Sequence, residues 1–122
     1  MRLFLCDDNP QYRQLVRLVL ERSGYQIVGE AADGREALER APETDAEVLL
    51  LDLNMPGVNG MEALPRLREA LPGTTLLVLT TWEMQDERER ALAAGADGFI
   101  LKPPRVSELE EKLRGALESA GS

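Results

Sequence analysis

Three short apolar runs in this sequence end in charged residues: residues 3–6 lead to Asp7 and Asp8, residues 47–51 to Asp52, and residues 99–101 to Lys102. If each run is a buried parallel strand, these side chains meet at the carboxyl edge of one sheet, where open α/β sheets bind ligands. Crowded carboxylates repel one another unless a cation joins them, and Mg²⁺ is a hard cation that prefers such oxygen ligands. One aspartate can then attack phosphorus, while the Lys102 ammonium neutralises charge on the transferring oxygens. The pattern predicts a magnesium site that handles a phosphoryl group.

Two further groups belong to this edge because of their positions in the chain. Thr80 ends the apolar run 75–80, and its hydroxyl can donate a hydrogen bond to a phosphate oxygen. Asn54 follows Asp52 by two residues, and its backbone carbonyl is placed to complete the metal shell. A hydroxyl and a carbonyl therefore join the acids and the lysine in the predicted site.

The elements that must position these groups alternate along the chain. We expect strands at residues 2–6, 26–31, 47–51, 75–80 and 98–101, and helices at 10–23, 34–41, 60–71, 84–94 and 105–119. Asn9-Pro10 is typical of a helix start, and Ser107 with Glu110 fits a capping box that would begin the last helix later. Strands that alternate with helices predict βαβ units and a parallel sheet of the α/β class.

The size and composition favour one soluble domain over residues 1–122. Its 122 residues suit a single core, and 43% hydrophobic with 30% charged residues is an ordinary globular balance. No apolar run approaches the roughly 20 residues that span a bilayer, and the apolar N-terminal run is too short for a signal peptide. A single cysteine, Cys6, agrees with a reducing compartment, so we expect a cytoplasmic location without membrane partners.

The charge and the missing residue types exclude several functions. A formal net charge of −8 argues against direct nucleic-acid contact by this domain, which would need a basic surface. The chain contains no histidine, which excludes a histidine general base, a histidine metal ligand and a phosphohistidine on this chain.

Five motifs follow one another in a specific order and spacing: Asp7-Asp8, Asp52-Leu53-Asn54-Met55-Pro56-Gly57, Thr80, Gly95-Ala96-Asp97-Gly98-Phe99 and Lys102-Pro103. Together they resemble the receiver domain of two-component response regulators over essentially the whole chain. Two longer stretches, residues 52–60 and residues 95–103, are similar to those of receivers that precede LuxR-type helix-turn-helix domains. The resemblance implies a five-stranded, doubly wound parallel sheet in the order 2-1-3-4-5 with five helices, a flavodoxin-like fold.

The resemblance also implies roles for single residues. Asp52 accepts a phosphoryl group from a histidine kinase, and Mg²⁺ is bound by the residues Asp7, Asp8, Asp52 and Asn54. Thr80 and Lys102 contact the phosphoryl group, and Phe99 turns inward behind Thr80 as a switch. Pro103 follows a cis peptide bond. The protein is then a signalling switch and not an enzyme, apart from catalysing its own phosphorylation and dephosphorylation.

The partners follow from the same resemblance. They are a sensor histidine kinase and a C-terminal DNA-binding output domain, which the printed sequence does not contain. Homodimer formation on phosphorylation and control of transcription are further expectations of this kind.

Residues near Thr80 depart from the family pattern. Thr81 stands where a smaller residue is usual, and its bulk would narrow access to Asp52. Trp82 and Asn54 occupy two positions that tune the lifetime of the phosphoryl group in the family. We hypothesise that Trp82 shields the acyl phosphate from water.

Three other interpretations remain. A phosphatase with Asp52 as nucleophile would need a leaving-group acid and a substrate cap, and the chain has no insertion long enough for a cap. A flavodoxin-like binding module would need a phosphate-cradling loop after the first strand, where this chain is acidic. A degenerate receiver is disfavoured because the acids, Thr80 and Lys102 are all present. Each polar group alone could be an ordinary surface or capping residue, so the receiver interpretation rests on their joint occurrence.

Overall fold

The strands and helices alternate along the chain as expected. The computed structural model describes residues 1–53, 60–81 and 85–120. The strands are β1 (Arg2–Cys6), β2 (Gln26–Ala31), β3 (Val48–Asp52), β4 (Thr75–Thr80) and β5 (Gly98–Leu101). The helices are α1 (Pro10–Arg22), α2 (Gly34–Arg40), α3 (Gly60–Ala70), α4 (Gln85–Ala93) and α5 (Leu109–Ala120), with short 3₁₀ turns η1 (Ala41–Glu43) and η2 (Val106–Glu108).

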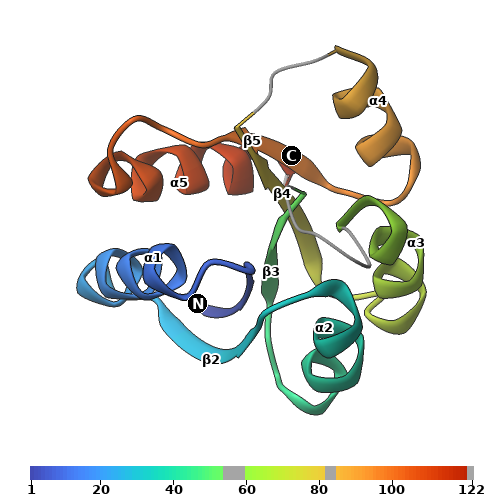
Figure 1. Ribbon diagram of the computed structural model, residues 1–122, viewed down its shortest axis with the longest axis horizontal. Helices are drawn as coiled ribbons and strands as arrows, with labels where there is room; N and C mark the ends of the chain where they lie inside the picture. Colours follow the sequence, from blue (N-terminus) through green and yellow to red (C-terminus); the bar gives the residue numbers. More distant parts are fainter. Residues whose placement is uncertain (54–59, 82–84, 121–122) are drawn as a thin grey trace.

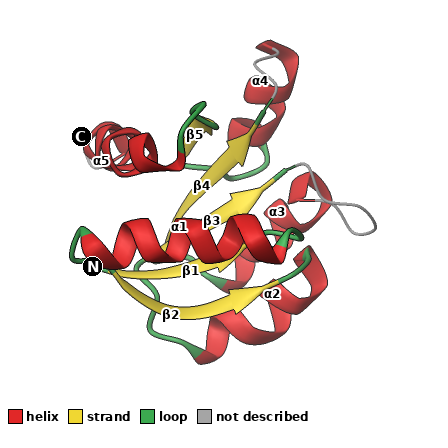
Figure 2. Ribbon diagram, turned by 60° about the vertical axis from the view of Figure 1, so that its left-hand side comes forward, coloured by secondary structure: helices red, strands yellow, loops and turns green. Residues whose placement is uncertain are grey.

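The sheet has five parallel strands in the order β2-β1-β3-β4-β5, as the sequence predicted. Helices α1 and α5 cover one face, and α2, α3 and α4 cover the other (Figure 1). The arrows of β1 to β4 point the same way, so their carboxyl ends meet at one edge (Figure 2). No helix in the described ranges is both long enough and apolar enough to cross a bilayer.

Alternate residues of the central strands fill two separate cores. Phe4, Leu49 and Val78 belong to the cluster under α2, α3 and α4, whereas Leu5 and Leu50 belong to the cluster under α1 and α5. Because both faces are covered, these strands are apolar throughout, as parallel strands usually are. The strands are therefore fixed rigidly, and so are the side chains that follow them.

The starts of α1 and α5 agree with the sequence signals. The Asn9 side chain accepts from the amides of Gln11 and Tyr12 and caps α1, ahead of Pro10 at the first helical position. Helix α5 begins at Leu109 after the η2 turn, later than residue 105, in agreement with the later start that a capping box would give. Strand β3 includes Asp52, one residue beyond the predicted end.

The expected cis bond before Pro103 is wrong. The described residues contain no cis peptide bond, so the Lys102–Pro103 bond is trans. The trans isomer is preferred by about 0.5–1 kcal/mol even before proline, and the sequence Lys102-Pro103-Pro104 does not overcome that preference here.

A network around Arg68 closes the amino edge of the sheet. The Arg68 guanidinium donates to the carbonyls of Leu71, Thr74 and Gly95 at 2.7, 2.7 and 3.3 Å. It also pairs with Asp97 at 2.9 Å, and the same Asp97 oxygen accepts from the Leu76 amide at 2.8 Å. Gly95 has φ +120°, and a Cβ there would lie 2.8 Å from the Arg68 side chain. We call Arg68, Asp97 and these backbone groups the Arg68 network.

Candidate functional site

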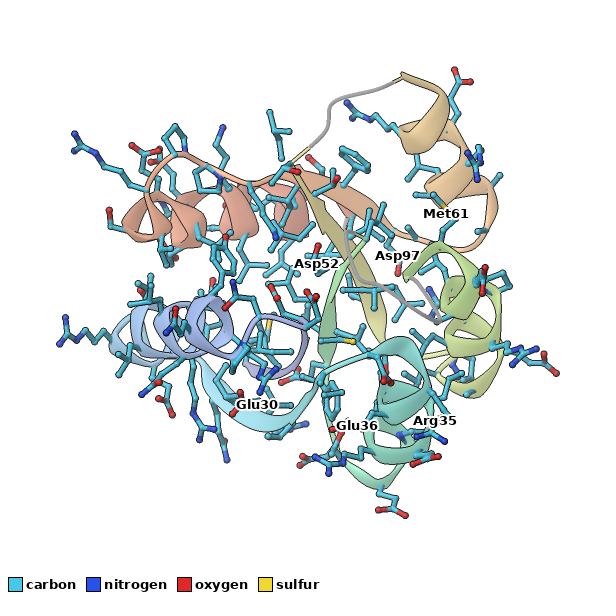
Figure 3. All side chains as sticks on the ribbon, viewed as in Figure 1. Glu30, Arg35, Glu36, Asp52, Met61 and Asp97 are labelled. Atoms are coloured by element: carbon cyan, nitrogen blue, oxygen red, sulfur yellow. The ribbon has the colours of Figure 1, made fainter. Side chains whose placement is uncertain are left out.

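Three aspartates lie together at the carboxyl edge of the sheet, where the sequence predicted them. Asp7, Asp8 and Asp52 each offer one carboxylate oxygen, and these oxygens lie within 4.8 Å of one another. Asp7 and Asp52 are buried, with 5% and 2% of their surface exposed, whereas Asp8 is exposed. Asp52 ends β3 near the centre of the molecule (Figure 3). Two carboxylates of the cluster are therefore buried, and the third, that of Asp8, faces solvent.

Lys102, the residue that follows β5, joins the cluster. Its Nζ lies 3.2 Å from Asp52 Oδ2, and both side chains are largely buried, with 15% and 3% exposed. The Lys102 amide donates to the Thr80 carbonyl at 2.7 Å, which fixes the ends of β4 and β5 beside each other. Thr80 itself is fully buried. The structure thus brings together Asp7, Asp8, Asp52 and Lys102, and it places the Thr80 backbone beside that of Lys102.

The loop after β1 is held in place by its own polar groups. The Asn9 amide donates to Asp7 Oδ1 at 2.9 Å, while the Asn9 side chain caps α1. The Arg13 guanidinium donates to the Asp7 carbonyl at 2.6 Å and pairs with Glu30 of β2 at 2.8 Å. Asp7 is therefore anchored through its side chain and its backbone before any ligand binds.

The electrostatics of the cluster favour a cation. Burial raises the pKa of Asp7 to about 6. The Asp52 and Asp8 charges contribute to this upward shift of the pKa, whereas the hydrogen bond from the Asn9 amide and the Lys102 charge oppose it. Three oxygens this close, with one carboxylate pushed toward its neutral form, match the donor set of Mg²⁺, which binds a few carboxylates together with water and phosphate oxygens.

Sequence analysis missed Tyr12, which lies in the first turn of α1. Its ring centroid is 4.6 Å from Lys102 Nζ, and the ring lines the same cavity as Asp7, Asp8, Asp52 and Lys102. Burial raises the pKa of Tyr12 to about 12, with Asp7 and Asp52 adding to the shift, so the phenol stays neutral at ordinary pH. The start of α1 at Asn9-Pro10 was the available signal, because it places the first turn of that helix at this edge.

The site opens through a cavity of about 340 Å³. Exposed Thr81 is among the residues that line it, and its predicted effect on access to Asp52 stays a prediction. Asn54 and Trp82 lie outside the described residues, so their predicted roles at the metal and in phosphoryl-group lifetime stay predictions. Phe99 of β5 is half-buried, and the Arg88 guanidinium lies 5.9 Å from its ring centroid.

Comparison with known proteins decides the family. Residues 3–114 match the response regulator receiver domain. The chain belongs to this family. Receiver domains of this kind are signalling switches of two-component systems.

Individual relatives agree with this assignment. The chemotaxis protein CheY of Thermotoga maritima is 31% identical over 112 residues, which are 92% of this chain and 93% of that protein. The nitrate/nitrite response regulator NarL of Escherichia coli K12 is 36% identical over 115 residues, or 93% of this chain.

Solved structures show the same fold. A LuxR-family two-component response regulator from Aurantimonas sp. SI85-9A1 aligns with a TM-score of 0.84 and 33% identity, covering 96% of this chain and 84% of that one. The receiver resembles those that precede LuxR-type output domains. The chain spans about half the length of the first curated relatives it matches, 53% in the case of NarL.

Proposed function

We propose that this chain accepts a phosphoryl group on Asp52 from a phosphohistidine of a sensor histidine kinase. The supporting observation is the position of Asp52: a buried carboxylate that ends a central strand, lies 3.2 Å from the Lys102 ammonium and shares a cluster with two other acids. The donor imidazole lies outside residues 1–122, because these residues contain no histidine.

In the proposed reaction an Asp52 oxygen bonds to phosphorus while the phosphorus–nitrogen bond of the phosphohistidine breaks. The electron pair of that bond stays on the imidazole nitrogen, which takes up a proton. Lys102 is close enough to neutralise charge on the transferred oxygens, and the Thr80 hydroxyl is expected to donate to one of them. Water later hydrolyses the acyl phosphate and restores Asp52.

Asp7, Asp8, Asp52 and the Asn54 carbonyl are the groups that we expect to hold Mg²⁺. When bound, the ion lowers the repulsion between the carboxylates and the incoming phosphoryl oxygens. Asp7 is suited to this task because its carboxylate is anchored by the Asn9 amide and is driven toward neutrality without a cation.

We further infer that phosphorylation shifts the population of two states around Thr80 and Phe99. A nearly complete switch from a rare active state needs about 5.5 kcal/mol. Charge-assisted hydrogen bonds from Thr80 and Lys102 to the new oxygens, each about 1.5–3 kcal/mol, are of the right size. Phe99 is half-buried, which leaves its ring room to change position.

The face formed by α4, β5 and α5 is proposed to contact the output domain or partner that responds to phosphorylation. A groove of about 470 Å³ there is lined by Arg88, Leu92, Phe99, Leu101 and Lys112, among other residues. We propose that residues 1–122 act as one receiver domain that controls a DNA-binding output domain, homodimer formation or both. The LuxR-family relatives support the transcriptional role.

Incubation with acetyl phosphate and Mg²⁺, followed by intact-mass measurement, tests this function. We expect a gain of one phosphoryl group that disappears without Mg²⁺ and in Asp52→Asn. Asp97→Asn is the matched control, because Asp97 also pairs with a cation but lies at the opposite edge of the sheet. A gain that survives in Asp52→Asn, or steady turnover of a general phosphate ester, would contradict the proposal.

A further inference from the structure

We propose that Tyr12 is a positioning residue for Lys102, and that its aromatic ring holds the ammonium at the phosphoryl site. The inference rests on the proposed function and adds to it a group that the family motifs do not contain. The Lys102 Nζ has two close partners, Asp52 Oδ2 at 3.2 Å and the Tyr12 ring centroid at 4.6 Å. A cation within about 6 Å of a ring centroid is attracted by the negative face of the ring.

The Tyr12 ring is itself fixed by the fold. The Tyr12 amide donates to Asn9 Oδ1 at 3.1 Å, and the ring packs against the buried cluster under α1 and α5. Asn9 also donates its amide to Asp7 Oδ1. One capping residue therefore fixes both a proposed metal ligand and the ring that contacts Lys102.

A lysine at this site needs such a support because its side chain is long and flexible. Four rotatable bonds give the ammonium many positions, and holding one of them loses conformational entropy. Asp52 alone is an unsuitable anchor, because its carboxylate changes from an anion to an acyl phosphate during the reaction. The ring does not change, so it keeps the ammonium nearby while Lys102 exchanges the carboxylate for a phosphoryl oxygen.

The ring, and not the hydroxyl, carries this role. The Tyr12 hydroxyl is buried and has no hydrogen-bond partner among the residues that the structure describes. A buried hydroxyl without a partner contributes nothing that phenylalanine would lack. Tyr12→Phe should therefore keep the function, and Tyr12→Leu should lose it.

The first test compares initial rates of acyl phosphate formation from acetyl phosphate and Mg²⁺. We expect Tyr12→Leu to be slower by about three- to tenfold, the range for a cation–π contact at a partly desolvated site. Tyr12→Phe should stay within about twofold of the wild type. Tyr25→Leu is the matched control. Tyr25 packs against the same buried cluster, but its hydroxyl lies beside Glu110 of α5 and not at the aspartate cluster.

The second test reads the Lys102 side chain directly by NMR and works on the wild-type protein. Methylene protons over an aromatic face shift upfield, so the Lys102 ε-CH₂ signals should do so in the wild type and in Tyr12→Phe. They should return to ordinary lysine positions in Tyr12→Leu. Ordinary positions in the wild type would overturn the proposal even if Tyr12→Leu did not fold.

Other results have definite meanings. Equal slowing in Tyr12→Phe and Tyr12→Leu would overturn the proposal in favour of the hydroxyl, and no slowing in Tyr12→Leu would remove the ring from the reaction. If Tyr25→Leu slowed acyl phosphate formation as much as Tyr12→Leu does, the slowing would be explained by lost packing, and the proposal would also be overturned. In all of these cases a wild type that gains a phosphoryl group leaves the proposed function standing, so the two failures can be told apart.

Discussion

The two edges of the sheet each place an aspartate beside a cationic side chain. At the carboxyl edge Asp52 pairs with Lys102 at 3.2 Å, and at the amino edge Asp97 pairs with Arg68 at 2.9 Å. The pair at the carboxyl edge shares its space with two more carboxylates. At the amino edge the Arg68 guanidinium also donates to the backbone carbonyls of Leu71 and Thr74, and the Asp97 oxygen accepts from the Leu76 amide.

The difference separates a functional site from a structural one. In the Arg68 network the Arg68 guanidinium and the Asp97 carboxylate both have hydrogen-bonding partners that stabilise the folded chain. In the acid cluster burial and neighbouring charges raise the pKa of Asp7, so folding without a cation is opposed there. Sites that depart from the most stable arrangement in this way are candidates for function. We therefore expect substitutions at the two edges to change the free energy of unfolding in opposite directions.

The largest change in stability is expected from Arg68→Met. The substitution keeps most of the aliphatic contact with Gly95 but leaves Asp97 and several carbonyls without their donor. The free energy of unfolding should fall by about 2–3 kcal/mol, as measured by urea denaturation. Phosphoryl acceptance at a temperature where the variant is folded should be unchanged.

Arg66→Met is the matched control, because Arg66 is exposed on the same helix. Its unfolding free energy should change by less than about 0.5 kcal/mol. If Arg68→Met changed stability no more than this control, or abolished phosphoryl acceptance while folded, the contrast between the edges would be wrong.

A smaller change of opposite sign is expected from Asp7→Asn. Without Mg²⁺ at about pH 7, removing one crowded carboxylate should raise the free energy of unfolding by about 1–2 kcal/mol. The asparagine oxygen can still accept from the Asn9 amide. Urea denaturation of this variant is best compared with Asp97→Asn, which should be destabilised because its ion pair with Arg68 is lost. If the unfolding free energies of Asp7→Asn and Asp97→Asn changed in the same direction, the proposed difference between the two edges would be wrong.

Mg²⁺ binding at the carboxyl edge should depend on pH because of the raised pKa of Asp7. The pKa of Asp7 lies near 6 in the folded protein against an ordinary value of 3.8, so the folded state holds this proton more tightly. The resulting stabilisation is complete below 3.8 and is lost as the pH rises through about 6. Mg²⁺ must displace the proton, and its affinity should rise about tenfold between about pH 5 and pH 7.

Isothermal titration calorimetry across this pH range checks the prediction. The proton released on Mg²⁺ binding should be detectable as a dependence of the heat on the buffer below about pH 6. Asp7→Asn should bind more weakly and lose the pH dependence. A flat affinity profile for the wild type would show that Asp7 is not a ligand or is already ionised.

Much of this arrangement was predictable because the carboxyl ends of parallel strands must meet. Asp7, Asp8, Asp52 and Lys102 follow strands directly, so the strand pattern alone brings them together. Four of the five strands coincide with apolar runs of the sequence, and the sheet order followed from the family resemblance.

Contacts that depend on helix rotation or turn geometry were not predictable. The contact of Tyr12 with Lys102 depends on the phase of α1 and on a strand far along the chain. The Arg68 network depends on carbonyl groups of turns, which carry no sequence signal. The cis bond at Pro103 was carried over from the family and is wrong, since the trans isomer is found.

The proposal that Asp52 accepts the phosphoryl group is tested by locating that group on the chain. After incubation with acetyl phosphate and Mg²⁺, borohydride reduces an aspartyl phosphate to homoserine, which peptide mass spectrometry can assign to one residue. We expect homoserine at position 52 alone, with none in Asp52→Asn. Homoserine at position 7, 8 or 97, or none in a sample whose intact mass shows one added phosphoryl group, would contradict it.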